Sequence, residues 1–141
     1  MDMNEAEREA YIAKIAEAAE ETFWGYLGCQ LESLSPKQAV ISLEATSHHM
    51  NLIGMVHGGV LSSLLDNAMG VLIATLLPGA KTVTTNLNVH FVAPMYAGKL
   101  IVTADLLHQS RKMLTVYGSI TDREGHLGSI GTGTFRIISG D

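Results

Sequence analysis

Apolar and polar positions recur with different periods along this chain of 141 residues, and the periods predict its elements. Residues 4–24 carry apolar side chains at helical spacing, among them Tyr11, Ile15 and Phe23, and Asn4 with Glu7 resembles a capping pair. We therefore expect one N-terminal amphipathic helix. Residues 37–45 alternate like a strand, and residues 46–57 are polar and irregular, which predicts a loop.

A long helix is predicted from about Gly58 to Leu77, where the sequence PGA at 78–80 ends it. Apolar side chains cover nearly every side of this helix, so we expect other elements to wrap it. The apolar run is long enough to suggest a membrane span. Polar residues interrupt it, however, and we interpret it as the buried helix of a soluble protein: Ser62, Ser63, Asp66, Asn67 and Thr75.

Four strand-like segments follow the long helix, at about 82–92, 99–108, 113–121 and 126–138. Alternation in the first places Val83, Leu87 and Phe91 on one face and Thr84 on the other. Short turn sequences separate the segments, and Gly125 suits a hairpin bulge. This order of elements predicts an α+β fold in which one curved antiparallel sheet wraps one long central helix.

Composition narrows the classes of protein that fit. The net charge of −5 argues against nucleic acid as a partner, because phosphate-binding surfaces are strongly basic. The lone Cys29 cannot form an intrachain disulfide, which fits a reducing compartment, and we expect it in the core. The acidic N-terminus does not resemble a secretory signal. We expect a cytoplasmic protein without a membrane or nucleic-acid partner.

Two glycines, Gly58 and Gly59, open the long helix. Their backbone N–H groups are unshielded, and the helix dipole adds positive potential, so this point suits an anion or a developing oxyanion. The alternative is that the glycines only let the loop enter the helix tightly.

Asp66 places a carboxylate among leucines, alanine and methionine, with no Lys or Arg within a turn or two. Such a group needs either a structural hydrogen bond or a chemical purpose, and a general base is the purpose that fits. Gly58 and Asp66 are eight residues apart, which is about 12 Å along a helix. They cannot both touch one reacting carbon, so a shared site would need two copies of the chain.

Polar residues of the preceding loop are further candidates. Asn51 and His57 are placed to orient a water or a carbonyl. His48 and His49 with His57 match no zinc spacing, so we expect no metal. The methionines either line an acyl pocket or fill the core.

Together, N-x-x-G-x-x-H-G-G and D-N-A-M-G on a long apolar helix resemble the hotdog-fold thioesterases, in particular the phenylacetic-acid-degradation-type, acyl-CoA thioesterase 13-like group. The sequence NLNVHFVAPMYAG also resembles a strand of that family. The resemblance covers about residues 37–138. It implies a hotdog thioesterase domain at 25–141 preceded by the N-terminal helix at 1–24.

The resemblance also implies roles for individual residues. Gly58 would polarise the thioester carbonyl through its N–H, and Asp66 of a partner chain would activate water or attack as a nucleophile. Asn51 and His57 would position the carbonyl or water. Thr84 falls where the family often has a Ser or Thr that holds the water. These enzymes form dimers, often paired into tetramers, with sites at the dimer interface.

Substrate-binding residues follow from the same resemblance. Gly59 and Met69 would contact the substrate, and Arg111 with Lys112 would bind the phosphates of coenzyme A. The alternative for the basic pair is a solvated hairpin turn. Coenzyme A is part of the substrate, so no cofactor is expected.

Two other functions remain open. One is a hotdog protein that binds or senses acyl-CoA without hydrolysing it. The other is a hydratase, although the Asp/His motif of that class is not found. An aspartate at position 66 favours the Asp-type thioesterases over the Glu-type group that acts on aromatic acyl groups, but the acyl chain itself is not determined by the sequence.

Overall fold

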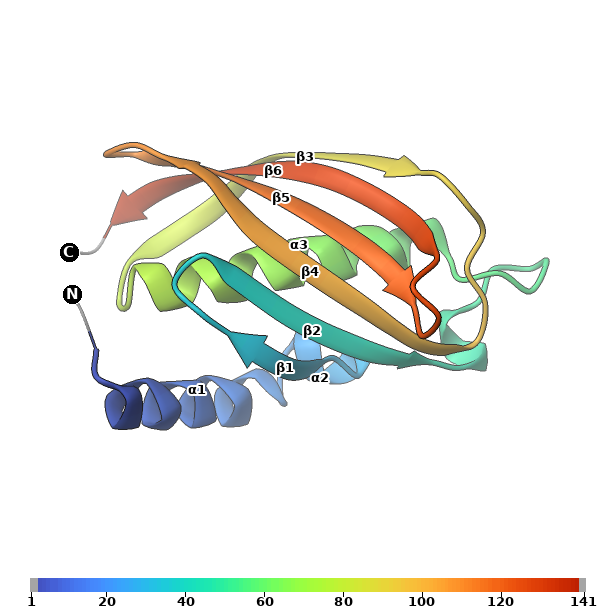
Figure 1. Ribbon diagram of the computed structural model, residues 1–141, viewed down its shortest axis with the longest axis horizontal. Coiled ribbons are helices and arrows are strands. Elements are labelled where there is room, and N and C mark those ends of the chain that lie inside the picture. The colour runs from blue at the N-terminus through green and yellow to red at the C-terminus, as the bar shows by residue number, and fades with distance from the viewer. Residues whose placement is uncertain (1–2, 140–141) are drawn as a thin grey trace.

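The computed structural model describes residues 3–139 as a curved antiparallel sheet around one long helix, with two helices at the N-terminus (Figure 1). The expected α+β class is confirmed, but the strands after the long helix are not one continuous meander, because the first of them pairs with the last and not with the next. The helices are α1 (Glu5–Ala19), α2 (Phe23–Leu27), the short 3₁₀ helix η1 (Ser47–His49) and α3 (Gly58–Leu76). The strands are β1 (Gln30–Leu34), β2 (Gln38–Ala45), β3 (Lys81–Phe91), β4 (Gly98–Gln109), β5 (Met113–Asp122) and β6 (Leu127–Ser139).

The sheet has the order β1-β2-β4-β5-β6-β3, and every neighbouring pair is antiparallel. β1 and β3 are therefore its two edges. One face of α3 packs against the concave side of the sheet, and the core forms between them. Gly118, Gly131 and Gly133 let α3 approach closely, because a Cβ at any of them would lie within about 3.4 Å of the Leu65 or Met69 side chain.

The N-terminal segment is two helices and not the single helix predicted over 4–24. α1 begins at the expected capping box, in which the Asn4 side chain accepts the Glu7 N–H and the Glu7 carboxylate accepts the Asn4 N–H. The chain then turns after Ala19, and α2 begins at Phe23, beside the end of α1. Gly25 permits this turn, because a Cβ there would lie 1.9 Å from the Glu20 carbonyl oxygen.

Strand β1 was missed by the sequence analysis because a bulge breaks its alternation. Leu31 pairs with Ile41 and Ser33 with Val40, which leaves Glu32 as an extra residue. The five residues of β1 therefore do not show the period of two that predicts a strand.

A second bulge corrects the predicted faces of β3. The register with β6 shifts between Thr84 and Asn86, so Thr85 is the extra residue. Thr84 consequently faces α3, on the same side as Leu87, whereas Val83 is 43% exposed. Placing Thr84 opposite Leu87 was wrong, because strict alternation does not survive an inserted residue.

Helix α3 is buried on the side facing the sheet and half-buried on the other side, so the expectation of wrapping all round is only partly correct. The half-buried side carries Asp66, Asn67, Gly70 and Ala74. α3 is the one helix among residues 3–139 that is long and apolar enough to span a membrane by length and composition. Half of that stretch is buried inside this fold, as expected of a core helix.

Candidate active site

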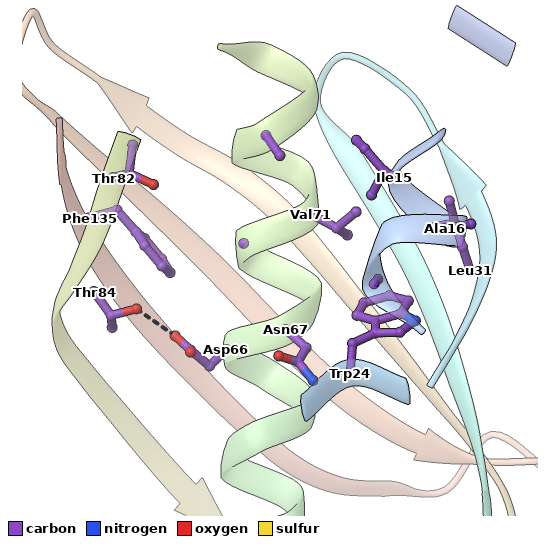
Figure 2. A pocket seen from close by; sticks show the side chains of 13 residues that line it. Ile15, Ala16, Trp24, Leu31, Asp66, Asn67, Val71, Thr82, Thr84 and Phe135 are labelled. Carbon is purple, nitrogen blue, oxygen red and sulfur yellow. Dashed lines mark hydrogen bonds between the residues drawn. The ribbon is translucent and has the colours of Figure 1, made fainter. Parts of the chain in front are cut away.

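Asp66 lies on α3 directly opposite Thr84 on the edge strand β3. The Thr84 hydroxyl donates a hydrogen bond of 2.8 Å to Oδ1 of Asp66 (Figure 2). The expectation that Asp66 is enclosed by apolar side chains is wrong for the single chain, in which it is half-buried. The hydrogen-bond partner of the Asp66 carboxylate is thus a hydroxyl and not a cation. One carboxylate oxygen accepts this bond, which leaves the other oxygen available to a water or a substrate.

A cavity of about 290 Å³ adjoins this pair, and we call it the Asp66 cavity. It crosses the half-buried side of α3, with β3 and β6 on one side and α1, α2 and β1 on the other (Figure 2). Its walls are mostly apolar, and the polar groups gather where Asp66, Asn67 and Thr84 meet. The lining residues are Ile15, Ala16, Ala19, Trp24, Leu31, Asp66, Asn67, Gly70, Val71, Ala74, Thr82, Thr84 and Phe135.

The first turn of α3 is capped by His57. Its Nδ1 accepts a hydrogen bond of 2.8 Å from the Gly59 N–H, so this nitrogen is unprotonated and Gly59 is already paired. The neighbouring Gly58 N–H has no acceptor among residues 3–139. The side chain of Phe91, at the end of β3, lies against Gly58. The unpaired donor at the positive end of the helix dipole is therefore the Gly58 N–H.

Asn51 organises the loop before α3. Its Oδ1 accepts hydrogen bonds from the N–H groups of Ile53 and Met55, each at 3.0 Å. This arrangement presents Leu52 fully to solvent at the tip of the loop. The oxygen of Asn51 is thus committed to the loop, while its amide nitrogen has no hydrogen bond to any part of the chain that the structure describes.

A second, wider cavity of about 700 Å³ lies beside the N-terminal end of α3 and includes His48, His49 and His57. His49 is held by the Thr46 N–H, which donates to Nδ1, and by the Leu27 carbonyl, which accepts from Nε2. Across residues 3–139, no three His, Cys, Asp or Glu side chains are grouped as a metal ion would require.

The remaining predicted residues lie away from Asp66. Arg111 and Lys112 form the exposed turn between β4 and β5, at the end of the molecule where α3 ends and far from where it begins (Figure 1). Met69 is fully buried against Gly118 and Gly133 on the sheet side of α3, and it lines neither cavity. Its position gives no support to the expected contact with substrate, because Met69 fills the core.

Sequence reasoning missed several residues of the Asp66 cavity. Asn67 lies beside Asp66, and its amide donates to the Cys29 sulfur at 3.5 Å. Cys29 itself is buried, as expected, and burial raises the pKa of its thiol. Trp24 comes from α2 and Phe135 from β6, and no local pattern connects either with position 66. Asn67 and Gly70, a polar residue and a glycine in the middle of an apolar helix, carried a signal in the sequence.

Known proteins are similar to this chain in sequence and in fold. A profile of the thioesterase superfamily matches residues 53–129, more than half of the chain. The chain is similar to human acyl-coenzyme A thioesterase 13, with 26% identity over 94 residues that span 66% of this chain and 67% of the human protein.

Solved structures extend the similarity. A mutant of the phenylacetic acid degradation protein PaaI from Thermus thermophilus is 28% identical, with a TM-score of 0.76 over 82% of this chain and 98% of that one. PaaI from the phenylacetic acid degradation operon of E. coli is similar in fold, with a TM-score of 0.84 at 24% identity over 94% of this chain and 95% of that one.

These similarities establish the class. The fold is the hotdog fold expected from the resemblance, with an added N-terminal helix. The chain belongs to the thioesterase superfamily, and the expected enzyme class, thioester hydrolase, is confirmed.

Proposed function

We propose that this protein hydrolyses the thioester of an acyl- or aryl-acyl-coenzyme A to the free acid and coenzyme A. The observation that carries the proposal is the Asp66–Thr84 pair at the mouth of an apolar cavity. A carboxylate provides the base or nucleophile, and the cavity provides space for an acyl group. The human relative is named as an acyl-coenzyme A thioesterase, which supports the substrate class.

The chemistry requires a carboxylate that acts as base or nucleophile and a hydrogen-bond donor that stabilises negative charge on the carbonyl oxygen. In the general-base form, Asp66 takes a proton from water as the oxygen attacks the thioester carbon, and the C–S bond then breaks to release the thiolate, which takes up that proton. In the nucleophilic form, Asp66 attacks the thioester carbon and expels the coenzyme A thiolate, and water then hydrolyses the mixed anhydride to the free acid and restores the carboxylate. In both forms the carbonyl oxygen becomes negative, and the Gly58 N–H is the donor that stabilises it. Thr84 holds the carboxylate, and through it the water.

Both groups meet only if two chains contribute. In one chain, Gly58 lies against Phe91 near the end of β3, whereas Asp66 is paired with Thr84 near its start. Among the described residues β3 pairs only with β6, so its outer edge is open to another strand. Antiparallel pairing of two β3 edges about a two-fold axis brings the start of one strand beside the end of the other. This supports a site with Asp66 from one protomer and Gly58 from its partner.

Other predicted residues complete the proposal. His57 holds the first turn of α3 so that the Gly58 N–H points outward, and the free amide of Asn51 positions the carbonyl or water. Arg111 and Lys112 bind phosphates of coenzyme A as exposed cations, without any added cofactor. The assembly is a homodimer, which pairs further into a tetramer. A cytoplasmic location agrees with the single buried Cys29.

The decisive experiment follows thiol release over a panel of acyl-CoAs and then mixes two inactive variants. Asp66→Asn removes the base, and Gly58→Pro removes the N–H. When the two are co-expressed, about half of the dimers are mixed, and each mixed dimer has one intact site and one doubly defective site. We expect about a quarter of the wild-type activity to return.

Two results would oppose the proposal in different ways. If neither single variant is impaired, the assigned groups are wrong. If both are impaired and mixing restores nothing, the site is not shared between chains. Tight binding of acyl-CoA by the wild type with no thiol release would instead favour a protein that senses or carries acyl-CoA.

A further inference from the structure

We propose that helix α1 is one wall of the acyl-binding pocket and sets the length of the acyl group that the enzyme accepts. The inference rests on the proposed function, because it takes the Asp66 cavity as the place where the acyl group lies. It adds a specificity determinant, formed by α1 and α2, that lies outside the part of the chain matching the thioesterase profile.

The position of α1 provides the first argument. Its residues Ile15, Ala16 and Ala19 line the same cavity as Asp66, although they lie about fifty residues earlier in the chain (Figure 2). They face the cavity from the side opposite β3, and Trp24 of α2 extends the same wall. An acyl group whose carbonyl reaches Asp66 must cross α3 toward this wall, since the sheet fills the other face of α3.

The docking of α1 provides the second argument. No residue of α1 is fully buried, so the helix contributes little to the core. Its one side-chain hydrogen bond to α3 joins the Tyr11 hydroxyl to the Ala74 carbonyl at 2.8 Å, and Ala74 also lines the cavity. A helix held by so few contacts can shift by small amounts, and each shift changes the width of the cavity.

Gly70 provides the third argument. A glycine inside a helix destabilises it relative to alanine, so it usually allows a close approach of another element. At Gly70 a Cβ would meet nothing within 4 Å, so no packing contact of the chain requires the glycine. The residue borders the Asp66 cavity one turn beyond Asp66. Its effect is to leave space on the path between Asp66 and the α1 wall.

The size of the cavity indicates the class of acyl group. Its volume is about 290 Å³. If a heavy atom with its hydrogens fills roughly the 30 Å³ that a water takes in the liquid, the cavity holds on the order of ten such groups. This volume suits a medium-length fatty acyl chain or an aryl-acyl group. A long-chain acyl group would need α1 to move away.

The test compares two substitutions on α1 in the full-length protein. Ala16→Leu adds a side chain inside the cavity, and Ala18→Leu adds the same side chain at an exposed position outside it. Both positions are exposed in the protein alone, so neither substitution disturbs a packed core. We measure kcat/KM for decanoyl-CoA and for butanoyl-CoA. Because each methylene in an apolar pocket changes specificity by about ten-fold or more, Ala16→Leu should lower the decanoyl-to-butanoyl ratio at least about ten-fold. Ala18→Leu should leave the ratio unchanged.

Gly70→Leu provides a second variant, which fills the cavity and also changes the stability of the protein. It should raise the melting temperature, because it replaces a helical glycine, and it should lower the same ratio because it fills the cavity. A merely structural role of Gly70 would not separate decanoyl-CoA from butanoyl-CoA.

A binding measurement separates this inference from the proposed function. Trp24 is the single tryptophan of the sequence and lines the cavity, so its fluorescence reports occupancy directly. Titration with decanoate should change the emission of the wild type and of Ala18→Leu, and at least about ten-fold more decanoate should be needed for Ala16→Leu. This readout does not depend on hydrolysis.

The outcomes are distinct. If acyl-CoAs are hydrolysed, but Ala16→Leu and Gly70→Leu keep the wild-type ratio and Trp24 does not respond to decanoate, the α1 wall is wrong and the proposed function stands. If no acyl-CoA is hydrolysed and Trp24 responds as expected, the proposed function fails and the cavity is an acyl site in a protein that only binds.

Discussion

The hydroxyl of Thr84 on β3 donates a 2.8 Å hydrogen bond to Asp66 on α3, and this bond joins the edge of the sheet to the central helix. The bond depends on the bulge at Thr85, which turns Thr84 toward α3 while Leu87 still packs on the core. It holds the Asp66 carboxylate next to β3, the edge strand of the sheet. If the β3 edges of two protomers pair, the Asp66 carboxylate therefore lies at the interface between them.

Replacing Asp66 with asparagine should abolish most of the activity and preserve the fold. A positioned general base contributes about 10²–10⁴-fold, so we expect a loss of that size in kcat. Asp66 is half-buried, and asparagine still accepts from Thr84, so the free energy of unfolding should change by about 1 kcal/mol or less. Thiol-release kinetics and chemical denaturation measure the two quantities. Turnover close to wild type would remove Asp66 from the chemistry.

The Thr84 hydroxyl should be needed for turnover. A hydrogen bond to a charged group contributes about 1.5–3 kcal/mol, so Thr84→Val should lower kcat/KM roughly 10- to 100-fold. Thr84→Ser keeps the hydroxyl and is the matched control, which should retain most of the activity. A loss in the serine variant with full activity in the valine variant would mean that the methyl group, and not the hydroxyl, matters. Steady-state kinetics on one acyl-CoA decides between them.

Gly58→Pro should remove one backbone donor with little damage to the helix. Proline fits the first helical position, and His57 already has φ −63° and ψ 136°, which suit a residue before proline. If the Gly58 N–H stabilises the oxyanion, kcat should fall about 10²–10³-fold at an unchanged melting temperature.

The control for this experiment is Gly58→Ala, which keeps the N–H. Its Cβ would lie 3.4 Å from the Phe91 ring, an ordinary contact, so the alanine variant should stay active. Full activity of the proline variant would show that the oxyanion is stabilised elsewhere.

His57 should stabilise α3 as its N-cap. Losing a capping side chain costs about 1 kcal/mol, so His57→Ala should lower the free energy of unfolding by that amount. Asparagine is also a good N-cap, so His57→Asn should restore stability. Denaturation of the three proteins measures this. If the asparagine variant is stable yet inactive, the imidazole also takes part in the chemistry.

Cys29 should be inert in the folded protein. Its side chain is 1% exposed, and burial raises the pKa of its thiol, so little of the reactive thiolate is present near neutral pH. Iodoacetamide should therefore label the protein only at the rate of unfolding, as followed by mass spectrometry. The same protein in denaturant is the control and should label fully. Rapid labelling of the native state would show that Cys29 is accessible.

The periodic elements were predictable and the irregular ones were not. The long helix is an apolar run that starts at two glycines and ends at PGA, the four later strands have strand-like patterns, and their predicted ends agree with the structure to within a residue or two. β1 and the face of Thr84 were missed because Glu32 and Thr85 are bulges, which pairing with a neighbouring strand defines and a local pattern does not. The break after α1 was missed because it depends on the contact between Gly25 and the Glu20 carbonyl.

The candidate site divides in the same way. Asp66 and Gly58 were recognisable because a carboxylate in an apolar run and a pair of glycines at a helix start are locally unusual. The residues that shape the cavity around Asp66, such as Ile15, Trp24 and Phe135, are ordinary apolar residues. Only the tertiary fold brings them together, so no spacing in the sequence could reveal them. The expected substrate contact of Met69 gains no support, because its helical position faces the sheet.

The extra residue at Thr85 makes the pairing of β3 with β6 a constraint separate from its composition. Before it, Thr84 is oriented toward Asp66, and after it, Leu87 and Val89 are oriented toward the core. Each of these side chains can be substituted individually. Thr84 and Leu87 are three positions apart, so strict alternation at this spacing would turn one of the two groups outward, and the bulge keeps both inside. Deleting the extra residue would leave the two groups two positions apart and still on one face, whereas regular pairing at the present spacing is incompatible with keeping both the packing and the carboxylate's partner.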